Sequence, residues 1–134
     1  MSRVTLGFVY SSMVFLLIGI TIGVLFFLVP EIRRLNVVHA HLNLVGFVIF
    51  LIFGVAYHIL PRFKGRPLYS VRLAWWQFWL ANIGLVGLLT FIVVGVYLSI
   101  DGLWYIQAVF AVLLGLSMYL FIYNILRTLI PSVE

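Results

Sequence analysis

The sequence predicts an all-α integral membrane protein built as a bundle of four transmembrane helices. Of its 134 residues, 66% are hydrophobic and 8% are charged, and the mean hydropathy is +1.28. A soluble domain carries about 45–50% apolar and about 25% charged residues. Four apolar stretches also reach the roughly 20 residues that a helix needs to cross a bilayer. The composition excludes a cytosolic enzyme, a nucleic-acid-binding module and a disordered tail. The lipid bilayer is therefore an expected partner of the chain.

The four spans are predicted at residues 7–30, 37–60, 73–100 and 104–130, within a single domain over residues 1–134. The first span is too long and too uniformly apolar for a cleavable signal peptide. Because the connectors are short, consecutive helices are expected to pack as antiparallel neighbours. Glycines within the spans are expected to allow close helix approach, but we read no particular contact face from them.

The basic residues predict the orientation of the chain. Four spans place the two termini and the connector between spans two and three on one side, and this side carries six Lys/Arg: Arg3, Arg62, Lys64, Arg66, Arg72 and Arg127. The other side carries only Arg33 and Arg34. Because Lys and Arg accumulate in cytoplasmic loops, we expect a multi-pass protein of the inner (cytoplasmic) membrane with both termini in the cytoplasm.

The polar residues that could carry chemistry are concentrated in the second span. His39, His41 and Asn43 lie within one or two turns of its outer end, and ionisable groups inside a span are costly and usually face a protein interior or cavity. Residues two apart on a helix point about 200° apart. His39 and His41 therefore face clefts on opposite sides of the helix and cannot chelate one ion together. One helix can therefore contribute a histidine to each of two sites. In a symmetric oligomer these two sites would be copies of the same site.

The surroundings of the two histidines differ. His39 shares its stripe with Asn43 and Gly46, where a missing side chain leaves room for a flat ligand, whereas His41 shares its stripe with aliphatic residues. Neutral imidazole is a common ligand of haem iron, copper and zinc. The alternative for both histidines is a polar outer turn solvated by lipid headgroups.

Three further charged or ionisable residues belong to the same span or its entrance. Arg33 and Arg34, one turn further out, could pair with haem propionates, and their alternative partner is lipid phosphate. His58 follows His41 by 17 residues, about 25 Å along a helix axis. It is expected to form a hydrogen bond at the cytoplasmic interface and is the least favoured of the three histidines as a metal ligand.

The second span resembles a helix of the haem–copper oxidase superfamily, which includes oxidase and nitric oxide reductase catalytic subunits. The resemblance rests on His39-Ala-His41-Leu-Asn43-Leu44 continued by Gly54-Val-Ala-Tyr57-His58-Ile-Leu-Pro61-Arg62-Phe63. In that superfamily a His-x-Asn-Leu stretch, matched here by residues 41–44, holds the low-spin haem. A His-x-His pair there binds the low-spin and high-spin haems, one histidine each. The match covers about 30 residues, and elsewhere only the span count and the hydrophobicity are similar.

The resemblance implies a shape and a cofactor. The family's catalytic subunit has about twelve spans in pseudo-threefold symmetry, so this chain resembles one third of it, and a homotrimer would rebuild the twelve-helix arrangement. Each cleft between subunits would then combine His39 of one copy with His41 of its neighbour around a six-coordinate haem b. The implied function is electron transport or haem-based sensing through this iron, with a quinol or a cytochrome as redox partner.

Other parts of the family pattern are missing from the sequence. Outside the second span the chain has no histidine, and no carboxylate lies at membrane depth. A self-sufficient oxygen or nitric oxide reductase is therefore not expected. Two alternatives to a haem protein stay open: a histidine-lined copper or zinc binding or transport protein, and a non-catalytic accessory subunit of a respiratory complex. The chain also lacks cysteine, which excludes disulfides and thiolate metal sites.

Overall fold

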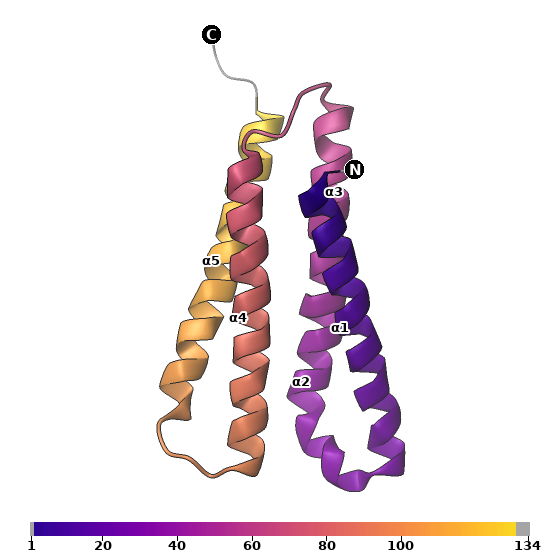
Figure 1. The fold of residues 1–134 in the computed structure, drawn as a ribbon, viewed down its shortest axis with the longest axis vertical. Helices are drawn as coiled ribbons and strands as arrows, with labels where there is room; N and C mark the ends of the chain where they lie inside the picture. The colour runs from indigo at the N-terminus through magenta and orange to yellow at the C-terminus, as the bar shows by residue number, and fades with distance from the viewer. Residues whose placement is uncertain (1, 131–134) are drawn as a thin grey trace.

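The structure, a computed structural model, describes residues 2–130 and confirms the predicted fold class. Within these residues it contains four helical segments long and apolar enough to cross a membrane. The segments run up and down as two adjacent hairpins (Figure 1). In chain order the elements are α1 (Arg3–Leu28), the 3-10 helix η1 (Pro30–Leu35), α2 (Asn36–His41), the π-helix η2 (Leu42–Ile49), α3 (Phe50–Phe63), α4 (Val71–Tyr97) and α5 (Leu103–Leu129).

The second span differs from the prediction in its length and its regularity. The expected connector at residues 31–36 is helical, because Pro30 begins η1, and a helical segment of 34 residues runs from Pro30 to Phe63. Proline suits a first helical position because its missing N–H would have no partner there. The π-helix in the middle of this segment was not predicted. Such wide turns are rare and frequently occur at functional sites.

The two ends of the bundle carry different charges. The start of α1 and the end of α5 lie at the same end as the loop between α3 and α4 (Figure 1). We call it the basic end because Arg3, Arg62, Lys64, Arg66, Arg72 and Arg127 belong to the helix ends and the loop found there. The opposite end, which we call the distal end, holds η1 and the loop between α4 and α5. The shared position of the start of α1 and the end of α5 agrees with an even number of spans.

Aromatic side chains join the first hairpin. Phe8 of α1 and Phe50 of α3 are fully buried, and their rings meet edge to face with centroids 5.5 Å apart. Phe53 continues this cluster to α5, where its ring centroid lies 4.4 Å from that of Phe121. Such aromatic pairs contribute about 0.5–1.5 kcal/mol beyond their buried area. Phenylalanines of the spans thus supply the core as well as part of the outer surface.

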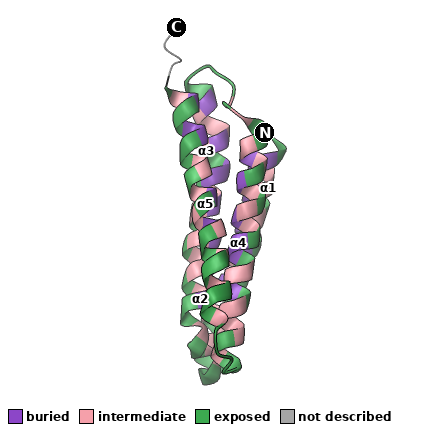
Figure 2. Ribbon diagram, turned by 90° about the vertical axis from the view of Figure 1, so that its left-hand side faces the viewer, coloured by how far each residue is buried: buried purple, intermediate pink, exposed green. Residues whose placement is uncertain are grey.

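The second hairpin is packed through small residues. A Cβ built on Gly84 of α4 would lie 2.7 Å from the backbone nitrogen of Leu114 in α5. Only glycine allows two helix backbones to approach this closely, as is common between membrane helices. Buried residues line the faces that the helices turn to one another, while exposed residues cover the outside (Figure 2). The large apolar exterior suits a bilayer as the surrounding solvent.

A side-chain amide connects the loop at the basic end to α5. Asn124 is fully buried, and its Oδ1 accepts a hydrogen bond from the Ser70 amide at 3.0 Å. Its Nδ2 donates to the Ser70 carbonyl at 2.9 Å. Thr128, one turn further along α5, accepts from the Tyr69 amide at 3.0 Å. These bonds hold the start of α4 against the end of α5.

Replacing Asn124 by alanine should lower the free energy of unfolding by about 2–4 kcal/mol, because each buried group left without its partner costs about 1–3 kcal/mol. Asn82→Ala is the matched control, since the Asn82 amide donates only to Phe78 of its own helix. It should cost less than about 1 kcal/mol. The measurement is the unfolding midpoint in detergent. Equal losses for the two variants would show that the loop is not held by Asn124.

Candidate functional site

The predicted site lies at the distal end, on the short helix α2 and the first turn of η2. His39 and His41 belong to the last turn of α2, and Asn43 is the second residue of the π-helix. Both histidines are half-buried. The helix therefore widens immediately after the His-x-His pair, at the point where α1 packs against it.

His39 is fixed against α1 of its own chain. Its Nδ1 lies 2.8 Å from the carbonyl oxygen of Gly19. Because a carbonyl can only accept, Nδ1 must carry the proton, and the neutral ring then presents its lone pair on Nε2. The amide nitrogen of Asn43 lies 3.3 Å from the same Nδ1, but two donors cannot bond. Asn43 donates instead to the His39 carbonyl at 2.8 Å.

His41 has the same tautomer on the other side of the helix. Its Nδ1 lies 2.9 Å from the Val37 carbonyl, one turn earlier, so this nitrogen also donates and Nε2 carries the lone pair. Within residues 2–130 the hydrogen bonds of both rings use Nδ1 alone. The aliphatic stripe predicted beside His41 is exposed at four of its positions, namely Leu44, Val48, Ile52 and Val55.

Two glycines of α1 make the room that His39 and Asn43 occupy. A Cβ on Gly19 would lie 2.7 Å from the Asn43 amide nitrogen, and one on Gly23 would lie 2.7 Å from His39 Cε1. The Phe26 ring, one turn further, is centred 5.2 Å from the imidazole of His39. This contact face was not predicted. The signal was present, because Gly19 and Gly23 form a Gly-x-x-x-Gly motif that is typical of close helix packing in membranes.

The expected room beside Gly46 is filled by the chain itself. Gly46 is buried, and a Cβ placed on it would lie 2.7 Å from Cβ of Phe15 in α1. The prediction that a flat ligand could lie there is therefore wrong, because α1 packs along the same stripe as His39 and Asn43. The cleft expected on the His39 side is likewise covered by α1 of the same chain.

The arginines and the third histidine occupy separate places. Arg33 donates through Nε to the Phe26 carbonyl at 2.9 Å and so caps the last turn of α1. Arg34 is exposed on η1 at the distal end. His58 lies in α3 near the basic end, where its Nε2 accepts a hydrogen bond from the Arg62 guanidinium. The structure thus brings His39, Asn43 and Arg33 to α1 and keeps His58 apart from them.

The donor set restricts which cofactor one chain could hold. Within residues 2–130, His, Cys, Asp and Glu side chains form no group of three that could bind a metal ion. Zinc usually takes three or four protein ligands, which one copy does not assemble here. A bis-histidine haem takes one imidazole on each side of the iron, and among the described residues neither Nε2 has a hydrogen-bond partner. The residues present therefore fit a haem shared between two copies of the chain better than a closed zinc site in one copy.

Comparison with known proteins finds a short likeness to oxidase subunits. The chain is 45% identical over 49 residues to "Cytochrome c oxidase subunit 1" of Rhodobacter capsulatus, a stretch that covers 36% of this chain and 9% of that protein. It is 41% identical over 49 residues to "Cytochrome c oxidase subunit 1 homolog" of Agrobacterium tumefaciens (strain T37), with the same coverage. No family model matches, and no solved structure matches. The chain is thus a multi-pass membrane protein with a partial similarity to oxidase subunit 1, and the matched segment is about a tenth of those relatives' length.

Proposed function

We propose that this chain is a membrane haem b protein, used for electron transfer or haem-based sensing, in which His39 and His41 ligate iron through Nε2. The observation that carries the proposal is the shared tautomer of the two rings, each with Nδ1 on a backbone carbonyl. Metal-bound histidines typically donate their other ring nitrogen in this way, which fixes the ring and raises its basicity. The partial similarity to oxidase subunit 1 supports the same cofactor class.

The proposal includes a homotrimer, with one haem between neighbouring copies. His39 and His41 lie on different sides of one helix. The His39 ring packs on α1 of its own chain but is only half-buried, so in the proposed site it would reach the haem from its exposed part, and His41 of a neighbouring copy would supply the second ligand. The exposed aliphatic stripe beside His41 offers an uncovered apolar face to a second copy. In a ring of three, every interface is the same and closes the assembly. The basic end faces the cytoplasm in this arrangement, as the distribution of Lys and Arg predicts.

A bound haem b would supply a one-electron couple. The chain's own residues would orient it. The Gly19 and Val37 carbonyls hold the two imidazoles in the ligating tautomer, and Asn43 braces the turn that carries His39. Arg34 at the distal end would face the propionates, while Arg33 already caps α1. Ligation of both axial positions would favour electron transfer over gas binding.

The test is an absorption spectrum of the protein purified from cells supplied with haem precursor, before and after reduction with dithionite. We expect a Soret band with sharp α and β bands on reduction, and a trimer by light scattering. A colourless protein that carries copper or zinc would favour a metal binding or transport protein. A colourless, metal-free protein in a large complex would favour an accessory subunit. A monomeric protein with the haem spectrum would contradict the proposed homotrimer and support haem binding.

A further inference from the structure

A cavity opens at the basic end, at the opposite end of the bundle from His39 and His41. It has a volume of about 380 Å³ and lies between the start of α1, the end of α3 and the start of α4, a size in the usual range of small-molecule pockets. Its polar lining includes Ser2, Tyr57, His58, Arg62 and Arg66, and its apolar lining includes Val4 and Ala74.

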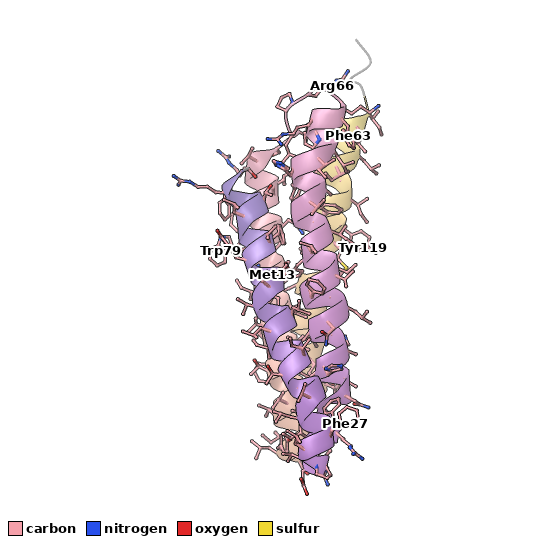
Figure 3. All side chains as sticks on the ribbon, turned by 90° about the vertical axis from the view of Figure 1, so that its right-hand side faces the viewer. Met13, Phe27, Phe63, Arg66, Trp79 and Tyr119 are labelled. Carbon is pink, nitrogen blue, oxygen red and sulfur yellow. The ribbon has the colours of Figure 1, made fainter. Side chains whose placement is uncertain are left out.

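The loop at the end of α3 fixes the backbone of one of these arginines. The Arg66 amide donates to the Pro61 carbonyl at 3.0 Å, and the Gly65 amide donates to the Arg62 carbonyl at 3.0 Å. Gly65 has φ +61°, so these two bonds form a Schellman motif with glycine in the left-handed position. The motif sets Arg66 beside Arg62 at the cavity (Figure 3 shows Arg66 at the end of α3).

The second arginine is held by His58. The Arg62 guanidinium donates to His58 Nε2, so the neutral ring carries its proton on Nδ1 and has no acceptor left. The ionisable lining of the cavity therefore offers donors and positive charge. Among the described residues the carboxylates are Glu31 and Asp101, and both lie at the distal end. The positive charge at the cavity is thus not compensated by a carboxylate of the described chain.

We propose that this cavity binds the phosphate group of a membrane phospholipid. Paired arginines favour phosphate because their planar forks match its oxygens and stay charged at every physiological pH. The apolar lining suits the glycerol and the first acyl carbons of a lipid. The cavity lies at a helix end, the level at which headgroups meet a spanning bundle. A free phosphate would satisfy the arginines equally well, and the two sources are separated by the test.

The test is a thermal unfolding titration of the delipidated protein in neutral detergent. The probes are dihexanoyl phosphatidylglycerol below its micelle concentration and, separately, inorganic phosphate. We expect the lipid to raise the melting temperature with saturation. Arg62→Gln and Arg66→Gln should each weaken the apparent affinity by about tenfold, since a charge-assisted hydrogen bond is lost. Lys64→Gln is the matched control, because Lys64 lies in the same loop, carries the same charge and does not line the cavity.

The outcomes separate the possibilities. Saturation by inorganic phosphate alone, with the same dependence on the two arginines, would keep the phosphate site and assign it to a soluble ligand. Equal weakening by Lys64→Gln, or a rise without saturation, would overturn the site and leave only general attraction of lipid to a basic surface. Far-UV circular dichroism checks that each variant keeps its helices, and Arg66→Gln leaves the bond between Arg62 and His58 intact.

Discussion

Haem content should collapse when either His39 or His41 is replaced by alanine, and it should stay unchanged in His58→Ala. The first two rings offer Nε2 to iron in the proposed site, whereas Nε2 of His58 accepts from Arg62 at the other end of the bundle. Losing an outer partner of a metal ligand typically costs about 10–100-fold in affinity, so losing the ligand itself should cost more. The measurement is the haem-to-protein ratio after purification, with the reduced spectrum.

Mixing the two variants tests whether the ligands come from different copies. When chains bearing His39→Ala and chains bearing His41→Ala assemble together at random, about one quarter of the interfaces in a ring should regain both histidines. The bis-histidine spectrum should return in that proportion. Failure of the mixture to recover any haem, while each variant stays folded and trimeric, would mean that the site is not shared between neighbours. Equal loss in His58→Ala would contradict the assignment of the ligands.

The fold could be predicted because its signals act over whole segments. A run of more than twenty apolar residues has few alternatives to a spanning helix, and four such runs bring the chain ends to one side. The helix period also predicted that His39 and His41 face different sides, and the structure agrees. It could not predict what lies on the His39 side, because the period of one helix carries no information about its neighbour.

The surroundings of the site depend on contacts between distant residues. Gly46 looked like an opening, and Phe15 of α1 fills it. The π-helix after His41 adds a residue to the turn, and tertiary packing decides where such a turn is stable. The Gly-x-x-x-Gly motif of α1 was the one signal that would have placed this helix beside His39. Gly19 lies against Asn43 and Gly23 lies against His39, so the packing of α1 also determines the orientation of the His39 imidazole.

Because of this contact, adding one methyl group to α1 is expected to disturb the site on α2 and η2. A Cβ at Gly19 would lie 2.7 Å from the Asn43 amide nitrogen, and one at Gly23 would lie 2.7 Å from His39 Cε1. Gly19→Ala and Gly23→Ala should each lower the free energy of unfolding by about 1–3 kcal/mol, as overpacking does. Gly115→Ala is the control, since nothing lies within 4 Å of its Cβ, and alanine there should gain up to about 1 kcal/mol.

Two readouts distinguish a local clash from general loosening of the bundle. Gly23→Ala should also weaken haem binding, because the added methyl group displaces the His39 ring from the Gly19 carbonyl. In an Asn43→Ala background, Gly19→Ala should become nearly neutral, because the side chain that it strikes is gone. Contacting residues show such coupling, typically about 0.5–3 kcal/mol in a double-mutant cycle. Additive losses at Gly19 and Asn43, or equal behaviour of Gly23→Ala and Gly115→Ala, would mean that α1 does not hold the imidazole, and the ligating tautomer would lose its structural basis.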